Sequence, residues 1–139
     1  MAGEGAPNVQ RIERNVAAVG AGADLETDLG EMPFAGTISL VEYIPSTVLT
    51  GANTDSRTLV LVNKGQSGAG TTVVATKAFT SGNNAPADDN TAITLSVVAG
   101  ATTVAAGDIL VWQSNHVGGT GLADPGGLVH VEVSRTAGS

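Results

Sequence analysis

Residues 105–114 read AAGDILVWQS and decide the fold of this chain. The letters predict a turn followed by a strand that carries the only tryptophan, Trp112. Because side chains alternate across a strand, Ile109 and Val111 point to one face. Leu110 and Trp112 point to the other face, so both faces are apolar and both need cover. One face suits the core of the domain, and the other needs a second layer, a neighbouring loop or another protein.

The composition favours an all-β domain. The chain has 139 residues, which fits one domain with a single core. Nineteen glycines, five prolines and many Thr, Val and Ala residues favour short strands over helices. With one Trp, one Tyr and two Phe, the core has to be built from Val, Leu and Ile, which suits a thin two-sheet sandwich.

The charge narrows the range of partners. A formal net charge of −7 and only six Lys plus Arg disfavour binding to nucleic acid or to an anionic membrane. We find no apolar run of the roughly 18 residues that cross a bilayer, and the first residues lack the features of a signal peptide. We expect a soluble protein made in a cytoplasm. The absence of cysteine excludes disulfides, thiolate nucleophiles and Cys-based zinc sites.

Residues 1–35 differ from the rest and are expected to form an N-terminal arm, with the sandwich domain over residues 36–139. Within residues 8–19 the apolar side chains follow helix-like spacings of three and four, with Asn8 as the N-cap and Gly20 as the stop. Two interpretations stay open: a solvated, extended arm, or an arm that becomes ordered on a partner. Its apolar positions are Val9, Ile12, Val16, Val19, Leu25, Leu29 and Met32.

Six main strands are expected after the arm. They cover residues 37–44, 56–63, 71–79, 91–98, 109–114 and 128–135, and glycine-rich loops join them. The first of these strands changes its apolar face part way along, which predicts a bulge before Pro45. An antiparallel two-sheet β-sandwich fits this pattern, with the jelly-roll and immunoglobulin-like strand orders both open. The predicted core consists of Leu59, Leu61, Val73, Ile93, Leu95, Ile109, Val111, Val129, Val131 and Val133.

The chain lacks the residue patterns of a catalytic or metal site, so we expect no enzyme, no cofactor and no metal. His116 follows the tryptophan strand in a glycine-rich loop, and His130 lies on the polar face of the last strand. Asp108 is expected to cap its own turn. The acidic residues within 24–31 and within 81–90 lack the spacing of a calcium loop. The glycines of 117–121 lack the helix and lysine of a phosphate-binding loop.

Several short motifs resemble small virion proteins of tailed bacteriophages, above all the head decoration, cement or minor capsid proteins. The likeness covers about residues 36–136. The motifs, in order, are Ile44-Pro45, Leu49-Thr50-Gly51, Ser56-Arg57-Thr58-Leu59, Val62-Asn63-Lys64-Gly65, Val104-Ala105-Ala106-Gly107-Asp108 and the run GTGLADPGG at 119–127.

This resemblance implies a non-enzymatic β-sandwich on the outside of a capsid, bound to the major capsid protein, often as a homotrimer, and reinforcing the shell. The alternative is a tail- or fibre-associated binding module that recognises a host glycan or a virion partner. Sugar stacking would need an exposed aromatic ring, for which Trp112 and Tyr43 are the candidates. The residues expected to contact a partner, either the coat protein or a sister subunit, are Val9, Ile12, Val16, Leu25 and Trp112.

Overall fold

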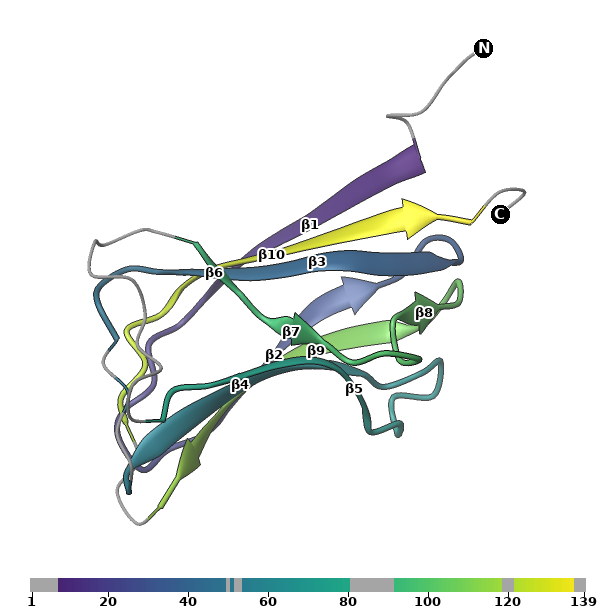
Figure 1. The fold of residues 1–139 in the computed structure, drawn as a ribbon. Coiled ribbons are helices and arrows are strands. Elements are labelled where there is room, and N and C mark those ends of the chain that lie inside the picture. Colours follow the sequence, from purple (N-terminus) through teal and green to yellow (C-terminus); the bar gives the residue numbers. More distant parts are fainter. Residues whose placement is uncertain (1–7, 50, 52–53, 81–91, 119–121, 137–139) are drawn as a thin grey trace.

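The computed structural model describes residues 8–49, 51, 54–80, 92–118 and 122–136. These residues form two antiparallel sheets that face each other, and no α-helix occurs among them (Figure 1). The predicted antiparallel two-sheet sandwich is therefore confirmed. Nothing in these segments is a helix long and apolar enough to cross a membrane. The strands are β1 (Val9–Val16), β2 (Leu25–Glu31), β3 (Gly36–Pro45), β4 (Ser56–Asn63), β5 (Thr72–Ala78), β6 (Ile93–Thr94), β7 (Ser96–Val97), β8 (Thr103–Val104), β9 (Ile109–Val117) and β10 (Gly127–Arg135).

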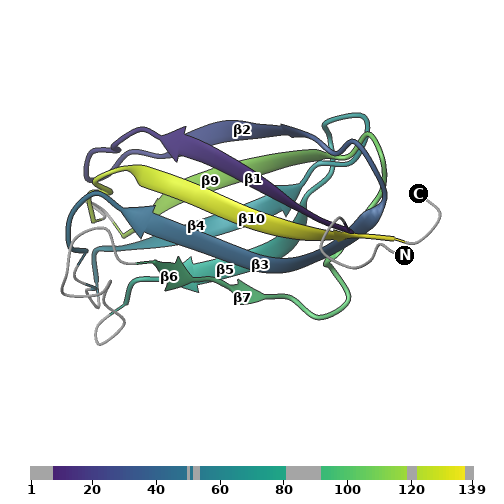
Figure 2. The same ribbon diagram turned by 90° about the horizontal axis from the view of Figure 1, so that it is seen from above.

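The strand order places the first two strands at the same side of the sandwich. In the first sheet, called sheet 1, the order is β1-β10-β3-β6, and β8 also pairs with β3. In sheet 2 the order is β2-β9-β4-β5-β7. Figure 2 shows β1 and β2 side by side above β10 and β9. Each of them is the end strand of its sheet.

From residue 8 on, the expected N-terminal arm is instead part of the sandwich, and residues 1–7 lie outside the described part. Residues 9–16 pair with β10 along their whole length, so the helix-like spacing there does not make a helix. Residues 25–31 pair with β9 in the other sheet. Val16 of β1 and Leu29 of β2 are buried, and so are Val19 and Met32, which lie just beyond the ends of these strands. A boundary at residue 35 would therefore divide a single core.

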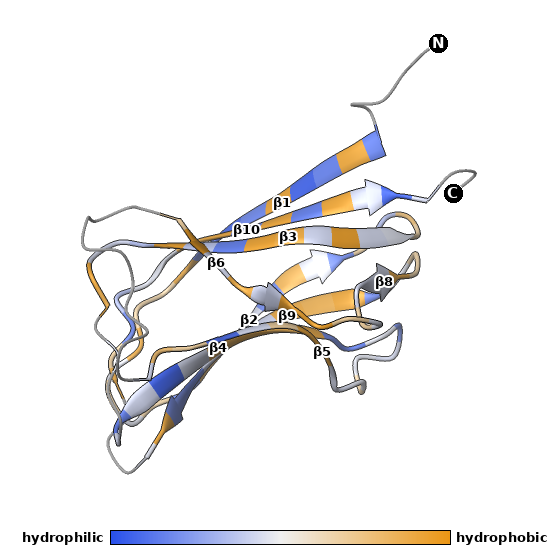
Figure 3. Ribbon diagram, viewed as in Figure 1, coloured by the Kyte–Doolittle hydropathy of each residue, from blue (hydrophilic) through white to orange (hydrophobic). Residues whose placement is uncertain are grey.

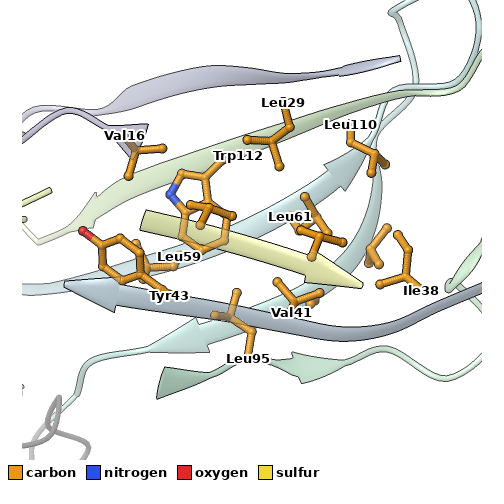
Figure 4. Close-up of a cluster of buried hydrophobic side chains, with 14 of the residues drawn as sticks. Val16, Leu29, Ile38, Val41, Tyr43, Leu59, Leu61, Leu95, Leu110 and Trp112 are labelled. Atoms are coloured by element: carbon orange, nitrogen blue, oxygen red, sulfur yellow. The ribbon is translucent and has the colours of Figure 1, made fainter. Parts of the chain in front are cut away.

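The core lies between the sheets and is mainly aliphatic (Figure 4). Its one aromatic pair joins Trp112 to Tyr43, with ring centroids 5.5 Å apart and planes tilted by 38°. Leu59, Leu61 and Leu110 contribute from the strands around this pair in sheet 2. Seven of the ten predicted core residues are buried there: Leu59, Leu61, Ile93, Leu95, Val129, Val131 and Val133.

The prediction that Ile109 and Val111 of β9 lie in the core is wrong. Leu110 and Trp112 point into the core, whereas Ile109 and Val111 lie on the outer face of sheet 2. Val111 is nevertheless only 1% exposed, and Val62, its neighbour on β4, is 4% exposed. The chain itself thus covers the part of this second apolar face around Val111 and Val62. Polar side chains also interact on the outer face of sheet 2. Glu26 accepts hydrogen bonds from Lys64 at 3.2 Å and from Gln113 at 3.0 Å.

In β5 and β3, a shift in the strand register interrupts the alternation of inward and outward side chains. In β5 the pairing passes from Ala75 to Val73, which leaves Val74 as the extra residue and directs it inward. Val73, predicted in the core, is 40% exposed as a result. In β3 the shift falls around Ser39, so the bulge expected before Pro45 is present, and it turns the strand to bury Val41 and its inward neighbours.

The expected strand over residues 91–98 is divided between the sheets. Ile93 and Thr94 pair with β3 in sheet 1, while Ser96 and Val97 pair with β5 in sheet 2. Leu95 lies between the two short strands and is 1% exposed. Val97 is 46% exposed, because the chain has left the regular alternation when it crosses to the second sheet. Residue 91 lies outside the described part.

Leu110 and Ile109 are adjacent on β9 and allow a matched test of which face of this strand points into the core. We expect Leu110→Ala to lower the free energy of unfolding by about 2 to 5 kcal/mol, because it leaves a cavity between the sheets. Ile109→Ala should cost less than half as much, since the Ile109 side chain is only half-buried on the outer face. Urea unfolding followed by tryptophan fluorescence measures both. An equal loss for the two variants would contradict the inward orientation of Leu110.

Candidate functional site

The five residues expected to contact a partner do not form one surface. Trp112 and Val16 are buried in the core, with exposed fractions of 1% and 7%, so neither is available to a partner in this fold. Ile12 on β1 is partly buried against the core, and Leu25 on β2 is partly buried. Val9, at the start of β1, is 44% exposed. The residues that stay accessible therefore belong to the two end strands.

The side of the sandwich where β1 and β2 run next to each other is the candidate partner-binding site, which we call the β1–β2 edge. The Nε atom of Arg14 crosses from β1 and donates to the carbonyl oxygen of Leu29 on β2, at 3.2 Å. Beside this contact lies a surface hollow of about 370 Å³. An end strand also has main-chain N–H and C=O groups on one side that no neighbouring strand uses. The hollow is lined by Gln10, Arg11, Ile12, Glu13, Arg14, Leu29, Gly30, Glu31 and Pro33.

A charged ladder joins β1 to β10 on the outer face of sheet 1. Hydrophilic and hydrophobic residues alternate along β1 and β10 (Figure 3). Because side chains alternate across a strand, the polar ones lie on one face. His130 Nδ1 lies 2.9 Å from Glu13 Oε2, and its Nε2 lies 3.0 Å from Glu132 Oε2. Arg11 Nε is 3.5 Å from the same oxygen of Glu132. Glu42 of β3 is opposite His130 in the register.

The two contacts of His130 favour its protonated form. An ionised carboxylate only accepts hydrogen bonds, so both ring nitrogens must carry a proton to bond to Glu13 and Glu132 together. Burial lowers the pKa of His130, but the hydrogen bonds to the two glutamates raise the pKa by more, to above its usual value of 6.5. The sequence suggested only a solvated histidine here, because Glu13 is distant in the chain.

The ladder should make stability depend on pH. The His130 pKa is raised by folding, so its contribution is complete below about pH 6.5 and is lost as the pH rises through the folded-state pKa. We expect the free energy of unfolding to fall over this range in the wild type and to change less in His130→Gln. Urea unfolding at a series of pH values measures this. An NMR titration giving His130 a pKa below 6.5 would contradict the ladder.

A buried polar network closes one end of the sandwich. The Asp124 carboxylate, only 2% exposed as a residue, accepts three hydrogen bonds. The donors are the Tyr43 hydroxyl at 2.5 Å, the Ser114 hydroxyl at 2.6 Å and the Gly126 amide at 2.9 Å. Burial, together with the Asp124 carboxylate, raises the pKa of Tyr43 far above its usual range, so its phenol stays a donor.

Arg57 is the cationic part of the same network. This residue is 0% exposed, and its Nη1 atom donates to the Ser114 hydroxyl at 3.1 Å. Its remaining donors reach carbonyl oxygens: Nη2 contacts Gly20 at 3.1 Å and Ala23 at 2.9 Å, and Nε contacts Leu122. Burial lowers the pKa of Arg57, while Asp124 and Asp24 favour the charged form. The loop between β1 and β2 and the loop before β10 are thus attached to β4 and β9.

Only part of this network could be predicted from the sequence. Arg57 is the one charged residue in the apolar strand 56–63, which is unusual for a central strand. Asp124 begins the turn-like sequence Asp-Pro-Gly-Gly, and nothing local distinguishes a turn aspartate from a buried one. Three of the partners are contributed by strands that are distant in the chain. Their convergence depends on the packing of both sheets.

We expect the network to stabilise the fold. Asp124→Asn removes the negative charge that faces three donors and takes away the carboxylate that most favours the charged form of Arg57. The expected loss in the free energy of unfolding is at least about 3 kcal/mol. Glu31→Gln makes the same chemical change at an exposed position and should alter stability by less than about 0.5 kcal/mol. Equal unfolding midpoints in urea for the two variants would contradict a stabilising role for the buried carboxylate.

The remaining expected polar positions have structural contacts. Asp108 caps its turn as predicted, accepting from the Ala105 amide at 2.8 Å, and it also accepts from the Asn63 side chain at 2.9 Å. His116 Nδ1 lies 2.6 Å from Asp24 Oδ1, and hydrogen bonds from His116 lower the pKa of Asp24. Among the described residues, no group of three or more His, Asp or Glu side chains is placed to hold a metal ion. The acidic loop at 81–90 and residues 119–121 lie outside the description.

Comparisons with protein-family models, with curated proteins and with solved structures find no match to this chain.

Proposed function

We propose that this protein is a structural component of a tailed-phage virion that binds the outer surface of the capsid and stabilises the shell. The proposal depends on the resemblance of its short motifs to head decoration and cement proteins. It includes the major capsid protein as the partner and the capsid exterior as the location. The trimer implied by the same resemblance stays a prediction.

The position of the motifs in the fold supports the proposal. Ile44-Pro45 ends β3, residues 56–65 form β4 and the turn after it, and residues 104–108 form the turn into β9. Residues 122–127 lead into β10 and contribute Asp124 to the buried network. The motifs thus mark the strand ends and turns of a two-sheet sandwich, which is the architecture that the resemblance implies.

The burial of the aromatic residues disfavours the glycan-binding alternative. Trp112 is 1% exposed, and Tyr43 and Phe79 are 0% exposed, so none of these rings can stack on a sugar. The remaining aromatic residue, Phe34, is partly buried, and the Arg135 guanidinium lies 5.1 Å from its ring centre. A sugar site on this domain would have to do without an open aromatic face.

The structure determines which form of the protein can be used to test attachment to the capsid. Deleting residues 1–33 would remove β1 and β2 together with Val16 and Leu29 of the core, so loss of binding by that variant would only report unfolding. The full chain is therefore the right reagent. Its net charge of −7 predicts that attachment to a basic patch on a coat protein weakens as salt is added.

We expect the purified chain to co-sediment with capsids of its own phage, to saturate, and to raise the temperature at which those capsids release DNA. Tails isolated from the same phage serve as the control particle. Binding to capsids with no effect on thermal release would leave attachment but remove the stabilising role. Binding to tails or to host cells in place of capsids would favour the tail-associated alternative and overturn the proposal.

A further inference from the structure

We propose that β1 is a self-association strand, which pairs antiparallel with β1 of a second copy of this chain about a two-fold axis at Ile12. The inference does not depend on the virion function. β1 is the end strand of sheet 1, and its eight residues pair with β10 without a register shift. Its far side is therefore a regular main-chain edge that another strand can extend.

The two faces of β1 have different characters. Arg11 and Glu13 lie on the outer face, because they contact Glu132 and His130. Ile12 points inward and packs against the core, and Arg14 reaches between the sheets to the Leu29 carbonyl oxygen. A second β1 strand has to keep outer side chains beside outer side chains if the two sandwiches are to form one continuous sheet.

Two-fold axes at Arg11, Ile12 and Glu13, near the middle of β1, all keep outer side chains beside outer side chains. Charge favours one of these three registers. An axis at Ile12 places Arg11 opposite Glu13 of the second copy, and Glu13 opposite its Arg11. An axis at Arg11 would oppose two arginines, and an axis at Glu13 would oppose two glutamates. Opposite charges directly across two strands stabilise the pair, whereas like charges destabilise it. The alternation of charge along residues 11–13 is thus self-complementary in one register.

The inner face of the same register is apolar at its centre. Ile12 would meet Ile12 of the second copy, next to the hollow that Leu29 and Pro33 help to line. Both isoleucine side chains would then lose water contact, which favours association. Two-fold contacts of this kind use the same patch on both subunits and close after two copies.

The other long end strand is protected from this kind of pairing. β2 contains Glu26, Asp28 and Glu31 and has no basic residue, so a second β2 would be repelled. Its pairing with β9 also shifts between Asp28 and Gly30, which interrupts the regular edge. At the far end of sheet 2, β7 is only two residues long. Among the described strands, β1 offers the most regular edge with matched charges.

Charge-reversal variants test the register. We expect the wild-type chain to sediment as an even-numbered species that dissociates on dilution. Arg11→Glu and Glu13→Arg should each lose this association, because each places like charges opposite each other. An equimolar mixture of the two variants should associate again, since every position 11–13 contact then joins opposite charges. Asp28→Arg, an equal change of charge on β2, should associate like the wild type.

The outcomes separate the proposal from its competitors. Circular dichroism melts of each variant show whether it is folded, and the recovery in the mixture cannot arise from a loss of folding. A wild type that stays a monomer or a trimer at its highest soluble concentration would overturn the proposal. So would a mixture that stays dissociated. Stronger association of Glu13→Arg would mean that β1 meets the acidic β2 of another copy, which also excludes the two-fold contact.

Discussion

The fold depends on the buried contact that Ser114 makes between the Asp124 carboxylate and the Arg57 guanidinium. The Ser114 hydroxyl donates to Asp124 and accepts from Arg57, so the two opposite charges interact through one side chain of β9. Removing such charges from water is costly unless their hydrogen-bonding groups are satisfied. Here the surrounding main chain supplies most of the partners. The network can exist only when both loops and both sheets are in place.

This requirement fixes the path of residues 8–35. Arg57 holds the carbonyl oxygens of Gly20 and Ala23, and Val19 exchanges two main-chain hydrogen bonds with Asp124. The chain between β1 and β2 is therefore fastened where it crosses from one sheet to the other. The strands β1 and β2 lie on either side of that crossing. The buried network therefore also positions the exposed β1–β2 edge.

The core leaves one polar group unsatisfied. The indole Nε1 of Trp112 is buried and has no hydrogen-bond partner among the described residues. A buried donor without an acceptor typically costs about 1 to 3 kcal/mol. The ring packs against Tyr43, whose own hydroxyl is used by Asp124. Burial of the large indole surface has to offset this cost, which places Trp112 in a packing role and removes it from partner contact.

A two-sheet sandwich by itself does not define a function, because the same architecture serves unrelated proteins. What the structure adds is a distinction between surfaces. On the outer face of sheet 2, Val111 and Val62 are buried by the chain's own side chains, whereas Val73 on the same face is 40% exposed. The edge at β1 has regular main-chain groups and matched charges.

The sequence by itself determined the fold class and much of the strand pattern. Alternation over 56–63 and 128–135 marked β4 and the inward valines of β10, because a strand buried on one or both faces shows its period directly. It also placed Asp108 correctly at its turn. These features depend on neighbours a few residues apart, so the local order of residues is sufficient.

Only the tertiary structure decided the features that join distant segments. The period of residues 8–19 fits a helix as well as a strand, and pairing with β10 selected the strand. On β9 both faces are apolar, so only the packing of sheet 1 against Leu110 and Trp112 identified the inner one. The bulge at Val74, the crossing at Leu95 and the burial of Asp124 likewise require contacts between strands far apart in the chain. Local periodicity contains no information about such contacts.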